Sequence, residues 1–233
     1  MSLDFPKSSY GSHLNIFLEL MESFVEKTES QILGWISEYK KEIFNQDLFW
    51  EEMKKDPNQE YISCIRYHSN LSDCELDLDF IFTEYFPSFQ RKSALISLCS
   101  FLEFELMQLC KSYKEIVPNY KTFQSKDVWI DRSVSYLIQH VGLTISKNNI
   151  IWNKIKIIQK IRNAIVHQNG QITFQHKDYK EINTFFLKNS KIWNIQNEII
   201  LKDGFLQYVL KSFNDFFEQI DNLIYKQQSF TYN

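Results

Sequence analysis

Glycine and proline are scarce in this sequence, which has 5 Gly and 4 Pro among 233 residues. Sandwiches and barrels need many tight turns, so this scarcity counts against them and favours long, uninterrupted helices. Hydrophobic residues make up 44% of the chain and aromatic residues 16%, enough to bury a substantial core. We therefore expect a globular, mainly α protein.

Cysteine pairs and metal-binding motifs are also missing. The four cysteines, Cys64, Cys74, Cys99 and Cys110, form no C-x-x-C pair and have no histidine at zinc-site spacing. We expect neither a metal nor a cofactor. Cys99 and Cys110 lie in an apolar helical run, and we interpret them as small buried hydrophobic residues.

The sequence shows no membrane span and no secretory signal. Its most apolar run, residues 94–110, contains Glu103 and Glu105, and residues 1–7 lack the basic-then-apolar order of a signal peptide. We expect a cytoplasmic protein without a membrane partner.

Acidic residues are absent from one long window. From Arg132 to Lys177 there is no Asp or Glu but there are 7 Lys or Arg, whereas the rest of the chain has all 29 acidic residues and 19 basic ones. One basic segment in a chain of net charge −3 suits a protein that holds a polyanion in one place and repels it elsewhere.

Apolar residues at three- and four-residue steps predict a helical bundle. Residues 88–113 should form its central helix, with Ser88 as the cap after Pro87, because their apolar side chains reach nearly all directions. The other predicted helices span residues 14–44, 76–85, 126–141, 148–168, 178–188 and 205–224.

Two alternating segments, residues 171–175 and 192–201, predict a small two-stranded β insert after helix 148–168. Residues 60–73 fit a short strand, an irregular crossing or a helical turn equally well. We expect residues 1–75 to form a long N-terminal helix with a connecting region, and residues 76–233 to form a helical domain packed with it as one unit.

The helix predicted for residues 148–168 places polar residues opposite its core face. On a helical wheel, Lys156, Lys160, Asn163 and His167 share one arc with Arg162 at its edge, and the isoleucines and Ala164 lie on the other side. The polar residues therefore point away from the core of their own subunit. A homodimer with two-fold symmetry would join two such sets in one basic cleft.

These residue types suit metal-independent cleavage of RNA. The ribose 2′-hydroxyl needs a base of near-neutral pKa, and the leaving oxygen needs an acid. His167 can fill those roles, Arg162 can stabilise the charged phosphorane, and Asn163 can position the phosphate. Lys154, Lys156 and Lys160 are the candidate RNA-binding residues.

Arg162-Asn163 with His167, followed by Asn169-Gly170, resembles the motif of the HEPN (higher eukaryotes and prokaryotes nucleotide-binding) superfamily. Residues 91–96 with Leu102-Glu103 resemble the upstream helix of that superfamily, in which a Leu-Glu pair recurs. The resemblance covers about residues 76–226. It implies a HEPN-like helical bundle that dimerises to join two motifs, and the endoribonuclease activity of a toxin or phage-defence effector.

Two questions stay open at the level of sequence. Glu103 can take part in catalysis, or it can be a buried acid that orients Arg162. The chain can also be a non-catalytic HEPN dimer that binds RNA or protein, because fold does not fix function. The resemblance further implies an antitoxin or defence protein as a possible partner. HEPN toxins that a nucleotidyltransferase silences have Tyr where this chain has Asn169, so we do not expect that control.

Overall fold

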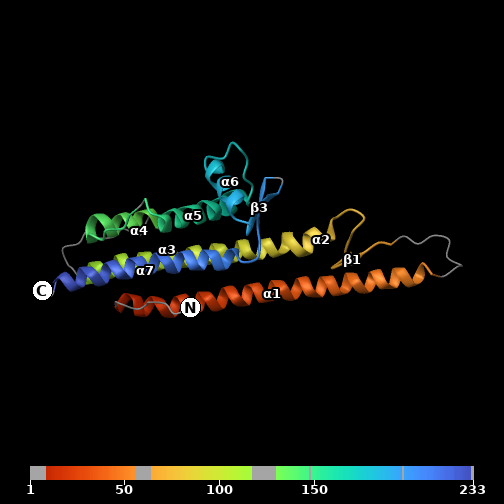
Figure 1. Ribbon diagram of the computed structural model, residues 1–233, viewed down its shortest axis with the longest axis horizontal. Coiled ribbons are helices and arrows are strands. Elements are labelled where there is room, and N and C mark those ends of the chain that lie inside the picture. Colours follow the sequence, from red (N-terminus) through yellow and green to blue (C-terminus); the bar gives the residue numbers. More distant parts are fainter. Residues whose placement is uncertain (1–8, 56–63, 117–129, 147, 196, 232–233) are drawn as a thin grey trace.

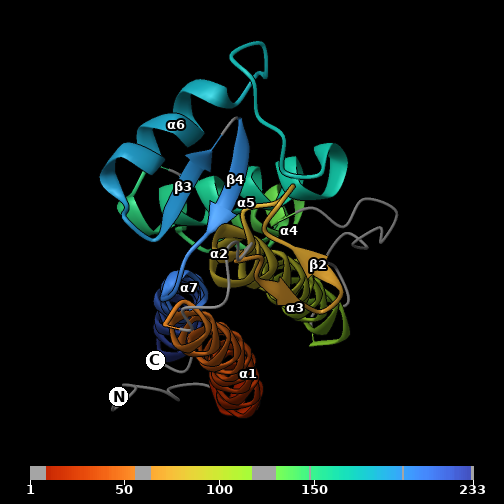
Figure 2. The same cartoon turned by 90° about the vertical axis from the view of Figure 1, so that its right-hand side faces the viewer.

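A computed structural model describes residues 9–55, 64–116, 130–146, 148–195 and 197–231. The chain is mainly helical, as the sequence predicts. Helices α1 (Ser9–Met53), α3 (Phe86–Ile116) and α7 (Phe205–Thr231) are the longest and pack against one another along the length of the molecule (Figure 1). Helix α5 (Ile150–Gln168) packs on α3 and α7 from the side opposite α1 (Figure 2).

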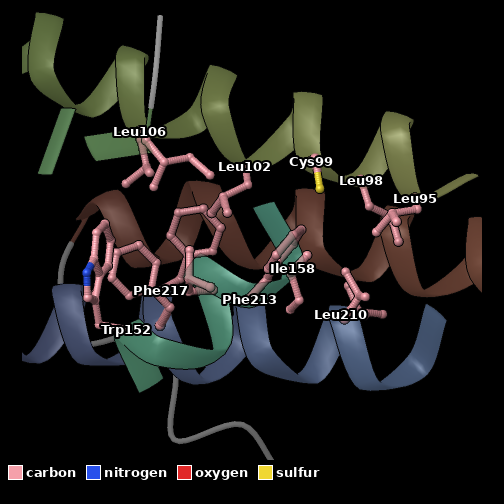
Figure 3. Packing of buried hydrophobic residues seen from close by; sticks show 14 of the residues in the cluster. Leu95, Leu98, Cys99, Leu102, Leu106, Trp152, Ile158, Leu210, Phe213 and Phe217 are labelled. Carbon is pink, nitrogen blue, oxygen red and sulfur yellow. The ribbon is translucent and has the colours of Figure 1, made fainter. Parts of the chain in front are cut away.

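Helix α3 is the central helix, which confirms the expectation from its apolar residues. It contacts α1, α5, α7 and the short helix α4 (Ile130–Tyr136). Leu102 of α3, Ile158 of α5 and Phe213 of α7 meet in the core that these helices share (Figure 3). All three side chains are buried.

Helix α1 extends well beyond the predicted range of residues 14–44. Its C-terminal extension packs against a hairpin formed by β1 (Tyr67–His68) and β2 (Leu71–Ser72). The Gln46 side-chain amide donates a hydrogen bond to the Tyr67 carbonyl and accepts one from the Tyr67 N–H. Asp47 forms an ion pair with Arg66 at 2.9 Å. These partners lie about twenty residues away in the chain, so helical periodicity could not reveal them. The hairpin also resolves part of the ambiguous segment 60–73, whose residues 60–63 lie outside the described part.

The expected break between two helices at Pro87 does not occur. Helix α2 (Leu78–Phe80) continues through a π-helical turn, η1 (Ile81–Tyr85), directly into α3. In this wide turn the Phe86 N–H bonds the carbonyl of Ile81. The turn comes just before Pro87, which has no N–H and would crowd the preceding turn of an ordinary α-helix. Ser88 is not a cap: its hydroxyl accepts a hydrogen bond from the Leu201 N–H at 2.9 Å.

The predicted ends of the two helices before the insert are confirmed. The helix that begins with α4 continues through a second π turn, η3 (Leu137–Val141), and ends at Gly142 with φ 80°. The start of α5 lies one residue later than the predicted Asn148: Asn149 is the cap, and its side chain accepts a hydrogen bond from the Trp152 N–H at 2.7 Å. Asn169 and Gly170 end α5 with φ 53° and 77°. Residues 126–129 of the predicted helix lie outside the described part.

The two-stranded β insert is present, but its predicted pairing is wrong. Strands β3 (Ile192–Ile195) and β4 (Glu198–Leu201) pair with each other after helix α6 (Tyr179–Lys188). Residues 171–175 contribute only a single bridge, from Gln171 to Glu198. Asn197, with φ 67°, lies in the tight turn between β3 and β4. A hairpin closed so locally costs less chain entropy than pairing across a helix.

The helix from Leu78 to Tyr113 is long and apolar enough to cross a membrane, judged by length and composition alone. Half of its most apolar window is buried inside the structure. The two acids Glu103 and Glu105, which led us to expect no membrane span, are therefore not enough to exclude one by composition. Its packing against four other helices is what marks it as a core helix.

Candidate functional site

Helix α5 holds the three motif residues through a firmly packed core face. Ile158, Ile161 and Ala164 are each at most 1% exposed, as the helical wheel predicts. The Asn169-Gly170 end fixes the last turn of the helix, because the N–H groups of both residues bond the Ala164 carbonyl. The motif therefore lies on a rigid element with a fixed end.

Arg162 does not point away from the core as the wheel predicts. It is half-buried, and its Nε atom is buried without a hydrogen-bond partner. Its charge acts on Cys99 and Glu103, so it faces helix α3. The wheel fails here because α5 packs on α3 along the edge of the polar arc, and Arg162 lies on that edge.

A hydrogen bond brings the Arg162 head group back toward the other motif residues. Its Nη1 donates to Oδ1 of Asn163 at 3.1 Å. Asn163 lies one turn before His167 on the same face, so the three side chains form a continuous strip from α3 to solvent. His167 is exposed, and no other described residue forms a hydrogen bond with its imidazole. Both ring nitrogens are open to a ligand.

Glu103 lies on α3 within electrostatic reach of Arg162. It is half-buried; burial raises the pKa of its carboxyl, and the positive charge of Arg162 lowers it in part. In the described part of the chain, no ion pair within 4.0 Å joins the two side chains. Glu103 therefore acts on Arg162 through space, and the positioning role and the catalytic role both stay predictions.

Cys99 completes the surroundings of Arg162 on α3. It is 2% exposed, and burial raises the pKa of its thiol to about 12, while Arg162 lowers it and Glu103 raises it. A thiol with this pKa is not ionised at neutral pH and is a poor nucleophile. The burial of Cys99 and Cys110 confirms their interpretation as small hydrophobic residues.

The three candidate RNA-binding lysines are all paired with acidic residues. Lys154 lies 3.4 Å from Asp215 of α7, and Lys156 bonds Asp131 of α4. Lys160 pairs with two acids at the start of α6, Asp178 at 3.2 Å and Glu181 at 2.6 Å. The window that lacks acids in the sequence is therefore not free of acids in space. RNA binding by these lysines stays a prediction, and phosphates would have to compete with four carboxylates.

Glu105 is more deeply buried than Glu103, although the sequence points to Glu103 as the buried acid. Its side chain is 1% exposed, and both carboxylate oxygens are buried without a hydrogen bond. Burial raises the pKa of Glu105, and His13, whose Nε2 lies 3.8 Å away, lowers it in part. A deeply buried acid without a hydrogen bond costs stability when it is ionised.

Replacing Glu105 with glutamine should therefore stabilise the protein at high pH. The folded-state pKa is raised above the unfolded value of about 4.3, so the favourable contribution of this group is complete below that value and is lost as pH rises through the folded-state pKa. We expect Glu105→Gln to raise the free energy of unfolding by about 1–3 kcal/mol at pH 8 and by nearly nothing at about pH 4. Urea unfolding at both pH values measures this. The exposed Glu26→Gln is the control, and equal effects of the two variants would contradict the prediction.

Comparison with known protein families, curated proteins and solved structures finds no match to this chain. Within the described residues, no group of three or more His, Cys, Asp or Glu side chains is placed to hold a metal ion. The site is thus defined by its own geometry: a half-buried arginine, an asparagine bonded to it, and an exposed histidine.

Proposed function

We propose that this protein is a metal-independent endoribonuclease of the HEPN type. The observation that carries the proposal is the Arg162–Asn163 hydrogen bond, which brings a cation toward the face of α5 that bears the exposed His167. Cleavage by a ribose 2′-hydroxyl requires proton transfer and stabilisation of the phosphorane charge, which the imidazole and the cation can supply while the amide positions the phosphate.

The proposed reaction is a transesterification at phosphorus, in which the ribose 2′-oxygen displaces the 5′-oxygen. One His167 imidazole accepts the 2′-hydroxyl proton as the 2′-oxygen attacks phosphorus. The P–O5′ bond breaks, and the leaving oxygen takes a proton from a separate group, the general acid. The products are a 2′,3′-cyclic phosphate and a 5′-hydroxyl. Arg162 stabilises the extra negative charge on the phosphorane, and the Asn163 amide donates to a phosphate oxygen.

A homodimer would supply this general acid. One subunit presents one histidine, one asparagine and one arginine along one side of α5. A two-fold copy facing this strip would add a second His167, so that one imidazole serves as base and the other as acid. Val166 lies between Asn163 and His167 in sequence and is 42% exposed, which gives the strip an apolar element for such a contact.

A toxin or phage-defence effector is the biological role that such an activity supports, with an antitoxin or defence protein as a possible partner. The alternative is a non-catalytic HEPN dimer that binds RNA or protein. The ion pairs of Lys154, Lys156 and Lys160 reduce the free positive charge beside the site, which favours protein binding over RNA binding within this alternative.

Incubating the purified protein with a fluorescent single-stranded RNA, with and without EDTA, separates these functions. We expect cleavage that EDTA leaves unchanged. Cleavage that stops with EDTA would contradict the metal-independent mechanism. Gel-shift binding without cleavage would favour a non-catalytic dimer that binds RNA. The absence of both binding and cleavage would contradict the ribonuclease and the RNA-binding dimer, and would leave the protein-binding dimer.

A further inference from the structure

A cavity of about 650 Å³ lies where α1, the η1–α3 junction and the β1–β2 hairpin meet. This volume falls in the range of small-molecule binding sites. On α3 the last residue lining the cavity is Gln90, and the first residue whose pKa the charge of Arg162 shifts is Cys99. Nine residues of helix separate the two places by about 14 Å. The cavity is therefore a separate feature from the α5 motif.

Aromatic side chains form most of the cavity wall. Trp35 of α1 and Phe86 and Phe89 of α3 line it and are 50%, 44% and 52% exposed. Single exposed aromatic residues are common, but three around one opening mark a place where a ligand could cover apolar surface. Phe82 and Tyr85 of η1 add two more rings to the same wall.

The inner part of the wall is preformed. The His68 ring lies edge-on to Phe82 at 4.3 Å and to Tyr39 at 5.1 Å, and its Nδ1 bonds Glu42 at 2.7 Å. The Tyr39 hydroxyl in turn donates to Asp79 at 2.8 Å. These contacts hold rings from α1, the hairpin and η1 in one arrangement, so a ligand would not have to order them.

The charges around the cavity select the kind of ligand. Glu38 lines it, and the ionisable His68 has its own carboxylate partner in Glu42. No Lys or Arg is among the described residues that line the cavity. A phosphate-bearing ligand would meet no cation here and one acid. A positively charged ligand would meet a carboxylate and several aromatic rings, the side chains that attract cations.

We propose that this cavity binds a small organic cation, of the alkylated ammonium class. The cationic head lies among Trp35, Phe86 and Phe89 with Glu38 at the rim, and the apolar remainder fills the space against Phe82. The proposal rests on the cavity alone and is independent of any ribonuclease activity at the α5 motif.

Calorimetric titration with acetylcholine and with its uncharged analogue 3,3-dimethylbutyl acetate tests this proposal. The two probes have nearly the same shape, so their difference isolates the charge. We expect acetylcholine to bind with a Kd of about 1 mM or lower and the analogue to bind about threefold to tenfold more weakly.

The variant Glu38→Gln should weaken acetylcholine binding about threefold and leave the analogue unchanged. Glu22→Gln, an exposed glutamate elsewhere on α1, is the matched control and should change neither. Trp35→Ala should weaken both probes. No binding of acetylcholine, equal affinity for the two probes, or equal behaviour of Glu38→Gln and Glu22→Gln would overturn the proposal.

Discussion

Replacing His167 with alanine is expected to lower the rate of RNA cleavage by about 10²- to 10⁴-fold, the usual contribution of a general acid–base group. The imidazole is exposed and makes no hydrogen bond within the described part of the chain, so its loss should leave the fold intact. If two copies of His167 act as base and acid in a dimer, each site loses both groups at once. The single-turnover rate on a defined RNA measures the effect.

Gln168→Ala is the matched control for this variant, because Gln168 is the next residue on the same exposed turn of α5. Its cleavage rate should equal that of the unmodified protein. Sedimentation of both variants should give the same dimer, so that a change in rate cannot be ascribed to a change in assembly. A His167→Ala protein that cleaves at the unmodified rate would rule out the proposed role of the imidazole.

Replacing Glu29 with alanine should lower the free energy of unfolding by about 3–5 kcal/mol, because it leaves Arg91 as an unpaired buried charge. Glu29 of α1 is 5% exposed and Arg91 of α3 is 3% exposed. Arg91 donates to both Glu29 oxygens, with an Nη2–Oε2 distance of 2.7 Å, and also to the Leu201 carbonyl of β4 at 3.3 Å. One arginine thus joins α1, α3 and the β insert.

Guanidinium unfolding measures this loss, with two comparisons. Glu26→Ala, an exposed change one turn earlier on α1, should stay within about 0.5 kcal/mol of the unmodified protein. The double variant Glu29→Leu with Arg91→Leu should recover much of the loss, because a buried ion pair can often be replaced by apolar residues. A loss below about 1 kcal/mol for Glu29→Ala would show that the pair is not buried as the structure has it.

The features that the sequence predicts correctly are local ones. The end of α5 at Asn169-Gly170 is predicted correctly and its start to within one residue, with Asn149 in place of Asn148, because a cap needs only its own few residues. The core face of α5 and the central place of α3 follow from helical periodicity in the same way. Whether this bundle is HEPN-like is part of the proposal, since the helical architecture alone does not distinguish a HEPN bundle from other helical bundles.

The features that the sequence does not predict depend on contacts between distant segments. Lys154 meets Asp215 sixty-one residues later, so the partial neutralisation of the basic window arises only in the folded chain. Arg162 lies on the edge of the polar arc, and only the packing of α5 on α3 decides that it turns inward. The aromatic cavity needs α1 beside η1, and the aromatic residues at 80–89 alone indicate no more than core.

The central claim is that the Arg162, Asn163 and His167 strip cuts RNA by means of the ribose 2′-hydroxyl. The most direct measurement compares one RNA of defined cleavage site with the same RNA carrying a single 2′-deoxyribose immediately 5′ to the scissile phosphate. The proposed mechanism predicts that this one change abolishes cleavage at that site, and that the unmodified RNA yields a 2′,3′-cyclic phosphate and a 5′-hydroxyl. Equal cleavage of both substrates, or a 5′-phosphate on the product, would contradict it.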